Sequence, residues 1–374
     1  MNVGINLLWL VPGGVGGSEE YITRQIAAMA AANQDRITLF VLPGFAAVHP
    51  GLVATCELVV APVRGLRREL RVAAEVVWLN GQLRRRRFDV VHHAGGTVPV
   101  GSPGPIVVTV HDIQYLVYPA TFSRLKLQYL RHAVPAAVRR AGLVVTPSQF
   151  VADTIAAAFH VPAERLVVAA NAPPPSVDAP TDRDALRRTY GLAGRVVLYP
   201  AITYRHKNHL KLLAAMEPLL RADPDMRLVL PGGTGPVEAD VRGMAGQFGI
   251  SAQVVRPGRI PAADLAGLYR LADVMAFPSR YEGFGVPVLE AMAAGCPVVA
   301  ASTTALPEAV DSAGLLVDPD DVDGWTESIR RVLFDAGVAD DLRERGYRRA
   351  AGFTVAASAD SLRRAYTLAM TLAV

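Results

Sequence analysis

The chain has 374 residues, more than the roughly 250–300 at which a single hydrophobic core stops growing, so we expect two domains. Hydrophobic residues make up 51% and charged residues 19%, which excludes a disordered chain. Cys56 and Cys296 lie far apart and fit no disulfide or zinc spacing, which predicts a reduced, cytoplasmic protein. The N-terminus lacks a basic region, and no apolar run reaches roughly 18 residues, so we expect neither a signal peptide nor a membrane span.

The net charge of +4 is unevenly distributed. Through Ala170 the chain carries sixteen basic and ten acidic residues, a balance of +6, and the remainder carries −2. Only three basic residues are lysines, at positions 126, 207 and 211. The first half is therefore the basic half, and arginine supplies nearly all of its charge.

Short apolar, β-branched runs alternate with helical patterns along the whole chain. The predicted strands of the first half are Val3–Leu10, Ile37–Leu42, Leu58–Val60, Val90–His92, Ile106–His111 and Leu143–Thr146. Those of the second half are Val196–Pro200, Arg227–Leu230, Gln253–Arg256, Val274–Phe277, Pro297–Ala300 and Leu315–Val317. Helices are predicted between most of them, for example at Ser18–Ala32 and Leu210–Arg221. This alternation is typical of an α/β protein with parallel sheets covered on both faces.

The segment Asn171–Pro180 contains three consecutive prolines and predicts an extended linker. We place the domains at residues 1–175 and 176–353, with a final segment at 354–374 that contains a helix, Ala356–Met370. Two open α/β domains joined in this way would form a central cleft, and their ligands would bind at the carboxyl ends of the strands.

A glycine-rich loop follows the first predicted strand. Gly14 and Gly16 match two positions of the dinucleotide fingerprint, but Glu19 stands at the third, which disfavours NAD. Gly16 and Gly17 would let a ligand approach the backbone at a helix N-terminus. The alternative is a tight turn with Ser18 as the helix cap.

Two basic residues follow the first strand of the second half. Arg205 and Lys207 lie in Tyr204-Arg-His-Lys-Asn-His209, between that strand and a helix, where fixed cations could neutralise a diphosphate. Lysine is rare in this chain, which favours a ligand role for Lys207. The alternative is a solvated basic loop.

The segment Ser279–Gly295 combines two glutamates with a bare glycine loop. Glu282 and Glu290 flank the backbone N–H groups of Phe284, Gly285 and Val286, which suit an anionic phosphate. We predict Glu290 in the first turn of the following helix, where its carboxylate could accept hydrogen bonds from ribose hydroxyls. A carboxylate in a first turn is otherwise ordinary helix design.

In the first half, His111 and Asp112 follow a predicted buried strand. This position favours a site role for His111, with Asp112 on the acceptor side. A lone histidine is more often structural, and that alternative stays open.

These motifs resemble the family 4 retaining glycosyltransferases of the GT-B fold. The resemblance rests on Glu282…Glu290, the first glycine loop, the His-Lys-Asn segment and Leu306-Pro-Glu308, and it covers essentially the whole chain. It implies two Rossmann-like domains that face a central cleft, with the C-terminal helix crossing back to the first domain. It also implies roles for particular residues: Glu290 on the donor ribose, Lys207 and Arg205 on the diphosphate, Glu282 on the sugar, Phe284–Val286 on sugar and phosphate, Arg259 and Ile260 at the nucleobase, and His111 beside the reacting sugar.

The expected reaction is the transfer of a hexose from a nucleotide-diphosphate sugar to a hydroxyl acceptor, through an oxocarbenium-like state and without a metal or other cofactor. The Asp-x-Asp strings, such as Asp223-Pro-Asp225, are no more than chance would supply. GDP-mannose is the first expected donor, with a UDP- or dTDP-sugar as an alternative, and the acceptor stays open between lipid-linked and small-molecule glycans. Two other classes are a sugar-nucleotide epimerase of the same fold and a non-enzymatic sugar-binding protein.

Arginines cluster at two places in the first half. Arg64, Arg67, Arg68 and Arg71 have a spacing that would place them on one helical face, opposite Leu66, Leu70, Ala73 and Val77, and Arg84–Arg87 form a second run. An anionic membrane surface would attract these cations, which predicts peripheral binding at the inner face of the membrane; a solvated helix face is the alternative. Nucleic acid is not expected, because no aromatic stacking platform accompanies the arginines.

Overall fold

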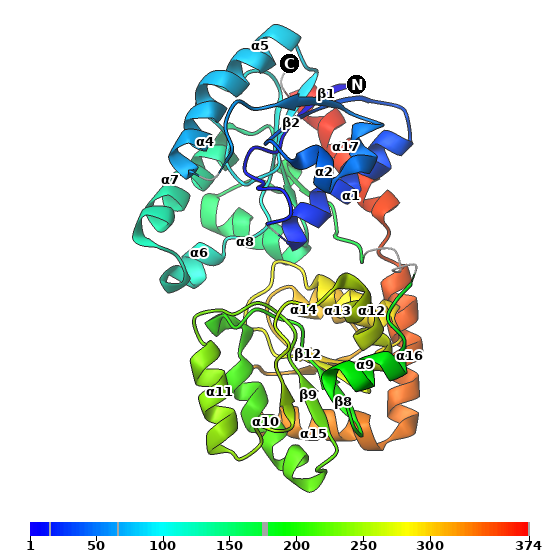
Figure 1. Ribbon diagram of the computed structural model, residues 1–374. Helices are drawn as coiled ribbons and strands as arrows, with labels where there is room; N and C mark the ends of the chain where they lie inside the picture. The colour runs from blue at the N-terminus through cyan, green and yellow to red at the C-terminus, as the bar shows by residue number, and fades with distance from the viewer. Residues whose placement is uncertain (15, 66, 174–178, 373–374) are drawn as a thin grey trace. The chain divides into compact units, whose positions relative to one another are not determined.

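The computed structural model describes residues 1–14, 16–65, 67–173 and 179–372, which divide into two compact units (Figure 1). The N-terminal unit comprises Met1–Asn171 and Thr354–Val374, and the C-terminal unit comprises Ala172–Phe353. The predicted linker falls largely on residues 174–178, which lie outside the described residues. The C-terminal segment belongs to the N-terminal unit, as expected for this fold class.

The N-terminal unit is built on a seven-stranded parallel sheet in the order β3-β2-β1-β4-β5-β6-β7. Its strands are β1 Asn2–Asn6, β2 Arg36–Val41, β3 Glu57–Val60, β4 Val90–His93, β5 Ile106–Thr109, β6 Leu143–Thr146 and β7 Leu166–Val168. The sequence did not predict β7, a three-residue edge strand whose side chains are only half-buried, so its apolar run is too short to stand out.

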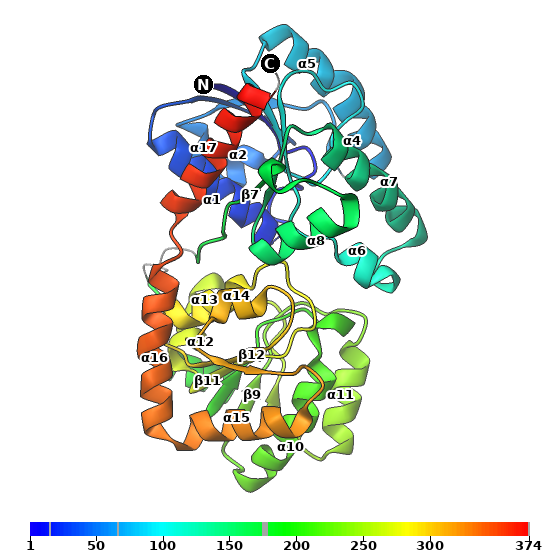
Figure 2. The ribbon, with the colours of Figure 1, turned by 180° about the vertical axis from the view of Figure 1, so that it is seen from behind.

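Helices cover both faces of this sheet. They are α1 Gly17–Ala31, α2 Phe45–Val48, α3 Pro50–Val53, α4 Arg68–Ala74, a π-helical turn η1 Glu75–Leu79, α5 Asn80–Arg86, α6 Gln114–Val117, a 3₁₀ turn η2 Pro119–Thr121, α7 Arg124–Arg140, α8 Gln149–Phe159, a 3₁₀ turn η3 Ala163–Arg165 and α17 Val355–Leu372. The C-terminal helix α17 packs beside α1, as the views from both sides show (Figures 1 and 2).

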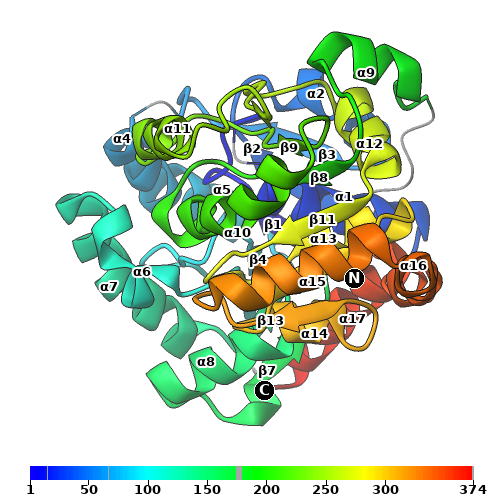
Figure 3. The same cartoon turned by 90° about the horizontal axis from the view of Figure 1, so that it is seen from below.

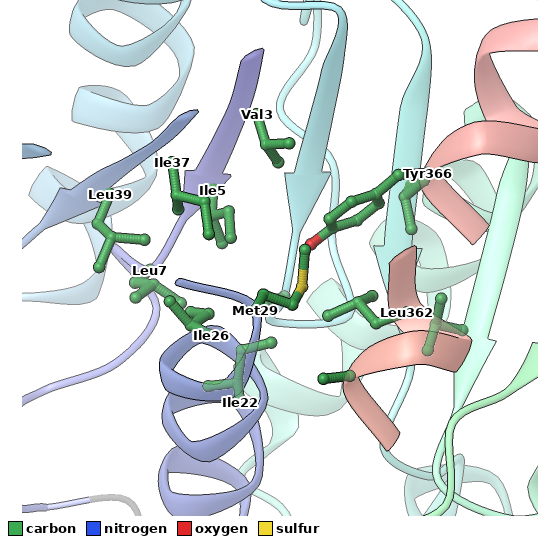
Figure 4. Packing of buried hydrophobic residues seen from close by; sticks show 14 of the residues in the cluster. Val3, Ile5, Leu7, Ile22, Ile26, Met29, Ile37, Leu39, Leu362 and Tyr366 are labelled. Carbon is green, nitrogen blue, oxygen red and sulfur yellow. The ribbon is translucent and has the colours of Figure 1, made fainter. Parts of the chain in front are cut away.

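One hydrophobic core of the N-terminal unit lies between the sheet and the α1–α17 pair. Strand residues such as Val3 and Ile5 point toward Ile22 of α1 and toward Leu362 and Tyr366 of α17 (Figure 4). All five side chains are fully buried. The last helix is therefore part of this core, because its apolar face completes the burial of the central strands.

The C-terminal unit carries a six-stranded parallel sheet in the order β10-β9-β8-β11-β12-β13. Its strands are β8 Val196–Leu198, β9 Arg227–Val229, β10 Val254–Val255, β11 Val274–Phe277, β12 Val298–Ala301 and β13 Leu315–Val317. Its helices are α9 Arg183–Tyr190, a 3₁₀ turn η4 Arg205–Lys207, α10 His209–Ala222, α11 Glu238–Gln247, α12 Ala262–Leu271, α13 Val286–Ala293, α14 Leu306–Val310, α15 Val322–Phe334 and α16 Ala336–Ala351. Seen from below, α10 and α15 lie side by side across this unit (Figure 3).

Both sheets have the doubly wound order in which the first and fourth strands of each unit are neighbours. At that place the strand order reverses, and open α/β sheets bind ligands there, outside the carboxyl ends of the strands. The predicted pair of Rossmann-like domains is confirmed by these two sheets. The reversal points, between β1 and β4 and between β8 and β11, mark where each unit would hold a ligand.

Two sequence-based expectations for the first strand and the first helix were wrong. Strand β1 ends at Asn6 rather than Leu10, because the Asn6 carboxamide accepts a hydrogen bond from the Leu8 N–H at 3.0 Å and turns the chain. Helix α1 is capped by Gly16, which has φ 80°, and begins at Gly17, so Ser18 is not its cap.

The arginine-rich stretch also differs from the prediction. Gly65 has φ +75° and packs against Leu42, so the chain turns there and α4 begins only at Arg68. Arg64 consequently lies outside the helix, Arg67 is its cap, and Leu66 lies outside the described residues. On the side predicted to be apolar, Leu70 and Val77 are 54% and 75% exposed, so that side is not a buried face.

Within the described ranges, none of the helices has the length and apolar character needed to cross a membrane.

Candidate active site

The centre of the candidate site is an ion pair in the C-terminal unit. Lys207 follows β8 and Glu282 follows β11, the two strands at which the order of the sheet reverses. The Lys207 ammonium lies 2.5 Å from the Glu282 Oε1 and 5.9 Å from the centre of the Phe277 ring. Both charged side chains are mostly buried, with 20% and 14% of their surface exposed. The sequence predicted both as site residues, and the fold brings them into direct contact.

The loop that carries Lys207 is fixed by several hydrogen bonds. The Tyr199 hydroxyl donates to the Lys207 carbonyl oxygen at 2.7 Å. Asn208 has φ 60° and donates through its side chain to the Pro319 carbonyl at 2.7 Å. Burial and the nearby Glu282 carboxylate raise the pKa of the Tyr199 hydroxyl far above its usual range, so this group stays a donor.

The loop before Glu282 is joined to the same network by Arg280. Its backbone N–H donates to the His206 carbonyl at 2.7 Å, and its guanidinium donates to the Asn208 side chain at 3.2 Å. The same guanidinium forms a two-pronged contact with Asp320, one arm of which is 2.8 Å long. Arg280 thus connects the loops that follow β8, β11 and β13. Sequence reasoning missed it, because an arginine in a loop carries no recognisable pattern.

Helix α13 begins directly after this loop. Gly285, its cap, has φ 108°, and a Cβ there would lie 2.8 Å from Leu306, so the position requires glycine. Phe284 is buried and Val286 is the first helical residue. Glu290 is the fifth residue of the helix and so lies in its second turn, not in the first turn as predicted. Its Oε2 accepts a hydrogen bond of 2.9 Å from the Tyr269 hydroxyl of α12.

A second glycine loop after β9, Gly232–Gly235, was missed by the sequence reasoning. A Cβ on Gly232 would lie 2.2 Å from the Ala201 carbonyl oxygen, so this loop lies directly against the loop that follows β8. The Arg259 guanidinium lies against Gly233, and Arg259 itself is exposed, with Ile260 beside it half-buried. The repeated glycines in Pro231-Gly-Gly-Thr-Gly235 are the signal that could have revealed the loop.

Not every predicted cation is held in this network. Arg205 is exposed and makes no ion pair or side-chain hydrogen bond within the described part of the chain. It lies in the same 3₁₀ turn as Lys207, so it is near the site but not fixed in it.

In the N-terminal unit the first glycine loop is closed by Glu19. Its Oε1 accepts a hydrogen bond from the Gly13 N–H at 2.8 Å and lies 2.8 Å from His49 Nε2. The glutamate that broke the dinucleotide fingerprint therefore binds the loop internally. Gly16 and Gly17 remain exposed, with no atom within 4 Å of a Cβ built on either.

His111 follows β5 and is fixed by its neighbours. Its Nε2 lies 3.0 Å from the Ala94 carbonyl oxygen, which can only accept, so Nε2 carries the proton and Nδ1 keeps its lone pair. The Tyr21 ring packs edge-on at 5.6 Å and the Trp9 ring lies tilted at 5.7 Å. Burial lowers the pKa of His111 to about 4, so the ring is neutral near pH 7. Asp112 is exposed beside it.

Among the described residues, no three His, Cys, Asp or Glu side chains come together as a metal site would require.

Comparison with known proteins shows the family to which the chain belongs. Residues 182–349 match the family described as Glycosyl transferases group 1, and residues 15–176 match the one described as Glycosyltransferase Family 4. The chain is 34% identical to the O-antigen chain mannosyltransferase B of Escherichia coli over 256 residues, which are 66% of each protein. It is 30% identical to the D-inositol 3-phosphate glycosyltransferase of Actinosynnema mirum, with 95% of this chain and 92% of that protein covered.

The fold has close structural counterparts. The sucrose-phosphate synthase of Thermosynechococcus elongatus aligns with a TM-score of 0.76 over 98% of both chains, at 21% sequence identity. Two Rossmann-like units of this kind are the GT-B fold. The chain belongs to the family 4, group 1 glycosyltransferases. It is an enzyme of the hexosyltransferase class, and this excludes the non-enzymatic sugar-binding protein.

Proposed function

We propose that this enzyme transfers a hexose, mannose in the first instance, from a nucleotide-diphosphate sugar to a hydroxyl acceptor, with retention of the anomeric configuration and without a metal ion. The observation that carries the proposal is the Lys207–Glu282 ion pair, which lies where the strand order of the C-terminal sheet reverses, between β8 and β11. A cation next to a carboxylate suits a substrate that has a diphosphate on one side and sugar hydroxyls on the other.

The proposed donor site uses the C-terminal unit. Lys207, with Arg205, neutralises the charge that develops on the diphosphate as the glycosidic bond breaks. The N–H groups at Phe284–Val286 add the positive end of helix α13. In the N-terminal unit, Gly16 and Gly17 are proposed separately to offer backbone N–H groups to the donor. Glu290, oriented by Tyr269, accepts hydrogen bonds from the ribose hydroxyls. Arg259 and Ile260 form the nucleobase loop.

Glu282 and His111 are the proposed residues at the reacting sugar. Glu282 accepts hydrogen bonds from sugar hydroxyls, and the neutral Nδ1 of His111 accepts one more. His111 has too low a pKa to deprotonate a hydroxyl efficiently near pH 7, which supports the departing phosphate as the group that takes the acceptor proton. Asp112 lies beside His111, where it contacts acceptor hydroxyls.

The proposal of mannose as the transferred sugar is supported by the relative from Escherichia coli, which is named a mannosyltransferase. GDP-mannose is therefore the first donor to test, followed by UDP- and dTDP-sugars. The enzyme is incubated with each donor, with and without lipid-linked and small-molecule glycan acceptors. Donor consumption that requires an acceptor supports transfer, whereas conversion of the donor alone to an isomer would indicate an epimerase instead.

We also propose that this cytoplasmic enzyme binds an anionic membrane surface through its N-terminal unit. Arg64 and Arg67 are exposed, and Leu70 and Val77 of the same stretch of chain are 54% and 75% exposed, so both cations and apolar side chains are available to a membrane. The run Arg84–Arg87 contributes less, because Arg84 donates to the Gly101 carbonyl and Arg86 pairs with Glu57. Co-sedimentation with anionic but not neutral liposomes tests this, and equal binding to both would contradict it.

A further inference from the structure

Three cations of the N-terminal unit converge where α4 meets α7. The Arg68 guanidinium lies 4.3 Å from the centre of the Tyr129 ring, so the two helices are in contact at this point. Lys126, at the start of α7, lies with its ammonium 5.1 Å from the centre of the Phe122 ring. Arg71 is one turn after Arg68 on α4, on the same side of the helix.

Among the residues that the structure describes, these cations lack the close carboxylate partner that some arginines of the chain have. Arg256 pairs with Glu238, and Arg280 pairs with Asp320. In the described residues, Arg68, Arg71 and Lys126 take part in no ion pair within 4 Å. Their mutual proximity is reflected in Lys126, whose pKa is lowered by burial first and then by Arg68 and Arg71. Unpaired like charges held together are a favourable place for an anion.

The cluster is next to the predicted acceptor residues. Asp112 acts electrostatically on Lys126 and partly offsets the two arginines. The carboxyl of Glu75, which lies one turn after Arg71, is buried and accepts a hydrogen bond from Asn6 at 3.2 Å. Burial raises the pKa of Glu75, and Arg71 acts on it in the opposite direction. Against these two carboxyl groups, the three cations keep a net positive charge beside His111-Asp112.

We propose that Arg68, Arg71 and Lys126 form an anion-binding subsite that receives a phosphate group of the hydroxyl acceptor. This assignment rests on the proposed function, which supplies the hydroxyl acceptor. Two guanidinium groups and one ammonium supply the several N–H donors that a phosphate prefers, and the position beside Asp112 would leave the acceptor's hydroxyls near His111. The phosphate belongs either to a soluble phosphomonoester or to a lipid headgroup.

Binding is measured directly, so that the outcome does not depend on transfer. All proteins carry Lys207→Gln, which removes the main phosphate cation of the C-terminal unit. D-inositol 3-phosphate and unphosphorylated inositol are titrated by calorimetry in one arm, and vesicles of phosphatidylinositol or phosphatidylcholine are sedimented in the other. The variants are Lys126→Gln and the pair Arg68→Gln with Arg71→Gln. The matched control is Arg131→Gln, an exposed cation on α7. Far-ultraviolet circular dichroism confirms that each variant is folded.

A preference for D-inositol 3-phosphate over inositol, or for phosphatidylinositol over phosphatidylcholine vesicles, supports the subsite when it is lost at least tenfold in both variants and kept in Arg131→Gln. The arm that responds identifies the source of the phosphate. The proposal is overturned when neither preference is seen, or when the control loses as much binding as the variants. Failure of hexose transfer in a separate activity assay would contradict the proposed function and would leave this binding result standing.

Discussion

Lys207 and Glu282 form a 2.5 Å ion pair between the loops that follow the two central strands of the C-terminal sheet. The carboxylate and a bound diphosphate would therefore compete for the same ammonium. Because Glu282→Gln removes this competition, we expect it to strengthen binding of the nucleoside diphosphate several-fold while transfer falls by about a hundredfold or more. Lys207→Gln should weaken the same binding at least tenfold.

Lys211→Gln is the control for this pair, since Lys211 lies on α10, directly after the turn that carries Lys207, and contacts Asp320 instead. Calorimetric titration with nucleoside diphosphates measures all three variants. Equal affinity in the wild type and Lys207→Gln, or weaker binding in Glu282→Gln, would contradict the assignment.

We expect the contact between Arg280 and Asp320 to affect donor binding by positioning the loops of the site, and not by touching the donor. Arg280→Gln removes the side-chain contacts with Asn208 and Asp320, and Asp320→Asn weakens the contact that holds the Arg280 guanidinium in place. We expect each to raise the donor KM about three- to tenfold with a smaller change in kcat, and the double variant to be no worse than the single ones. The exposed pair Arg330–Glu327 on α15 is the control, and Arg330→Gln should change neither constant. Additive losses in the double variant would show that the two residues act separately.

Tyr269 should act on ribose recognition through Glu290. Removing its hydroxyl in Tyr269→Phe deletes the 2.9 Å hydrogen bond to the carboxylate. A hydrogen bond to a charged group contributes about 1.5–3 kcal/mol, so we expect nucleoside diphosphate to bind about tenfold more weakly. The preference over the 2′-deoxy nucleotide should shrink as well. Tyr190→Phe is matched to it, because Tyr190 donates to Asp264 at 2.5 Å in the same unit. If both variants lose affinity equally, the effect is not specific to Glu290.

Two buried histidines should make the N-terminal unit sensitive to acid. Burial lowers the pKa of His92 and of His93 to about 3, whereas the unfolded chain binds these protons near pH 6.5. The unfolded state therefore binds more protons between these values, and stability decreases as the pH falls below about 6.5. At about pH 5 each histidine should cost about 2 kcal/mol of the free energy of unfolding.

Urea unfolding at neutral pH and at about pH 5 measures this cost. In His92→Gln the loss between the two conditions should be about 2 kcal/mol smaller than in the wild type. The exposed His132 of α7 serves as the control, and His132→Gln should leave the loss unchanged. The same loss in all three proteins would contradict the assignment to His92.

Much of the fold could be predicted, because buried strands appear in the sequence as runs of apolar residues. Strands such as Leu143–Thr146 and Val274–Phe277 are continuous apolar runs, and the structure has them with the same bounds. The predictions were wrong where a single polar contact or backbone angle determines where a strand ends or a helix begins. Asn6 ends the first strand through a side-chain hydrogen bond, and Gly65 delays helix α4 by its positive φ. Neither effect has a periodicity that a sequence pattern could reveal.

Individual residues of the candidate site could be predicted from the sequence, but the contacts between them could not. Glycine loops and charged residues after strands indicated Lys207, Glu282 and Glu290. The contact between Lys207 and Glu282 depends on strand order, which brings β8 beside β11 although 75 residues separate the two side chains. Arg280 was missed for the same reason, since its partners come from loops that are distant in the sequence.

The most direct test is the fate of the anomeric carbon. GDP-mannose, then UDP- and dTDP-sugars, labelled in the hexose, are incubated with glycan acceptors, and the linkage formed is determined by NMR. We predict label transfer with the anomeric configuration of the donor preserved, and loss of that transfer in Lys207→Gln. An inverted configuration, or undiminished transfer by Lys207→Gln, would contradict the account.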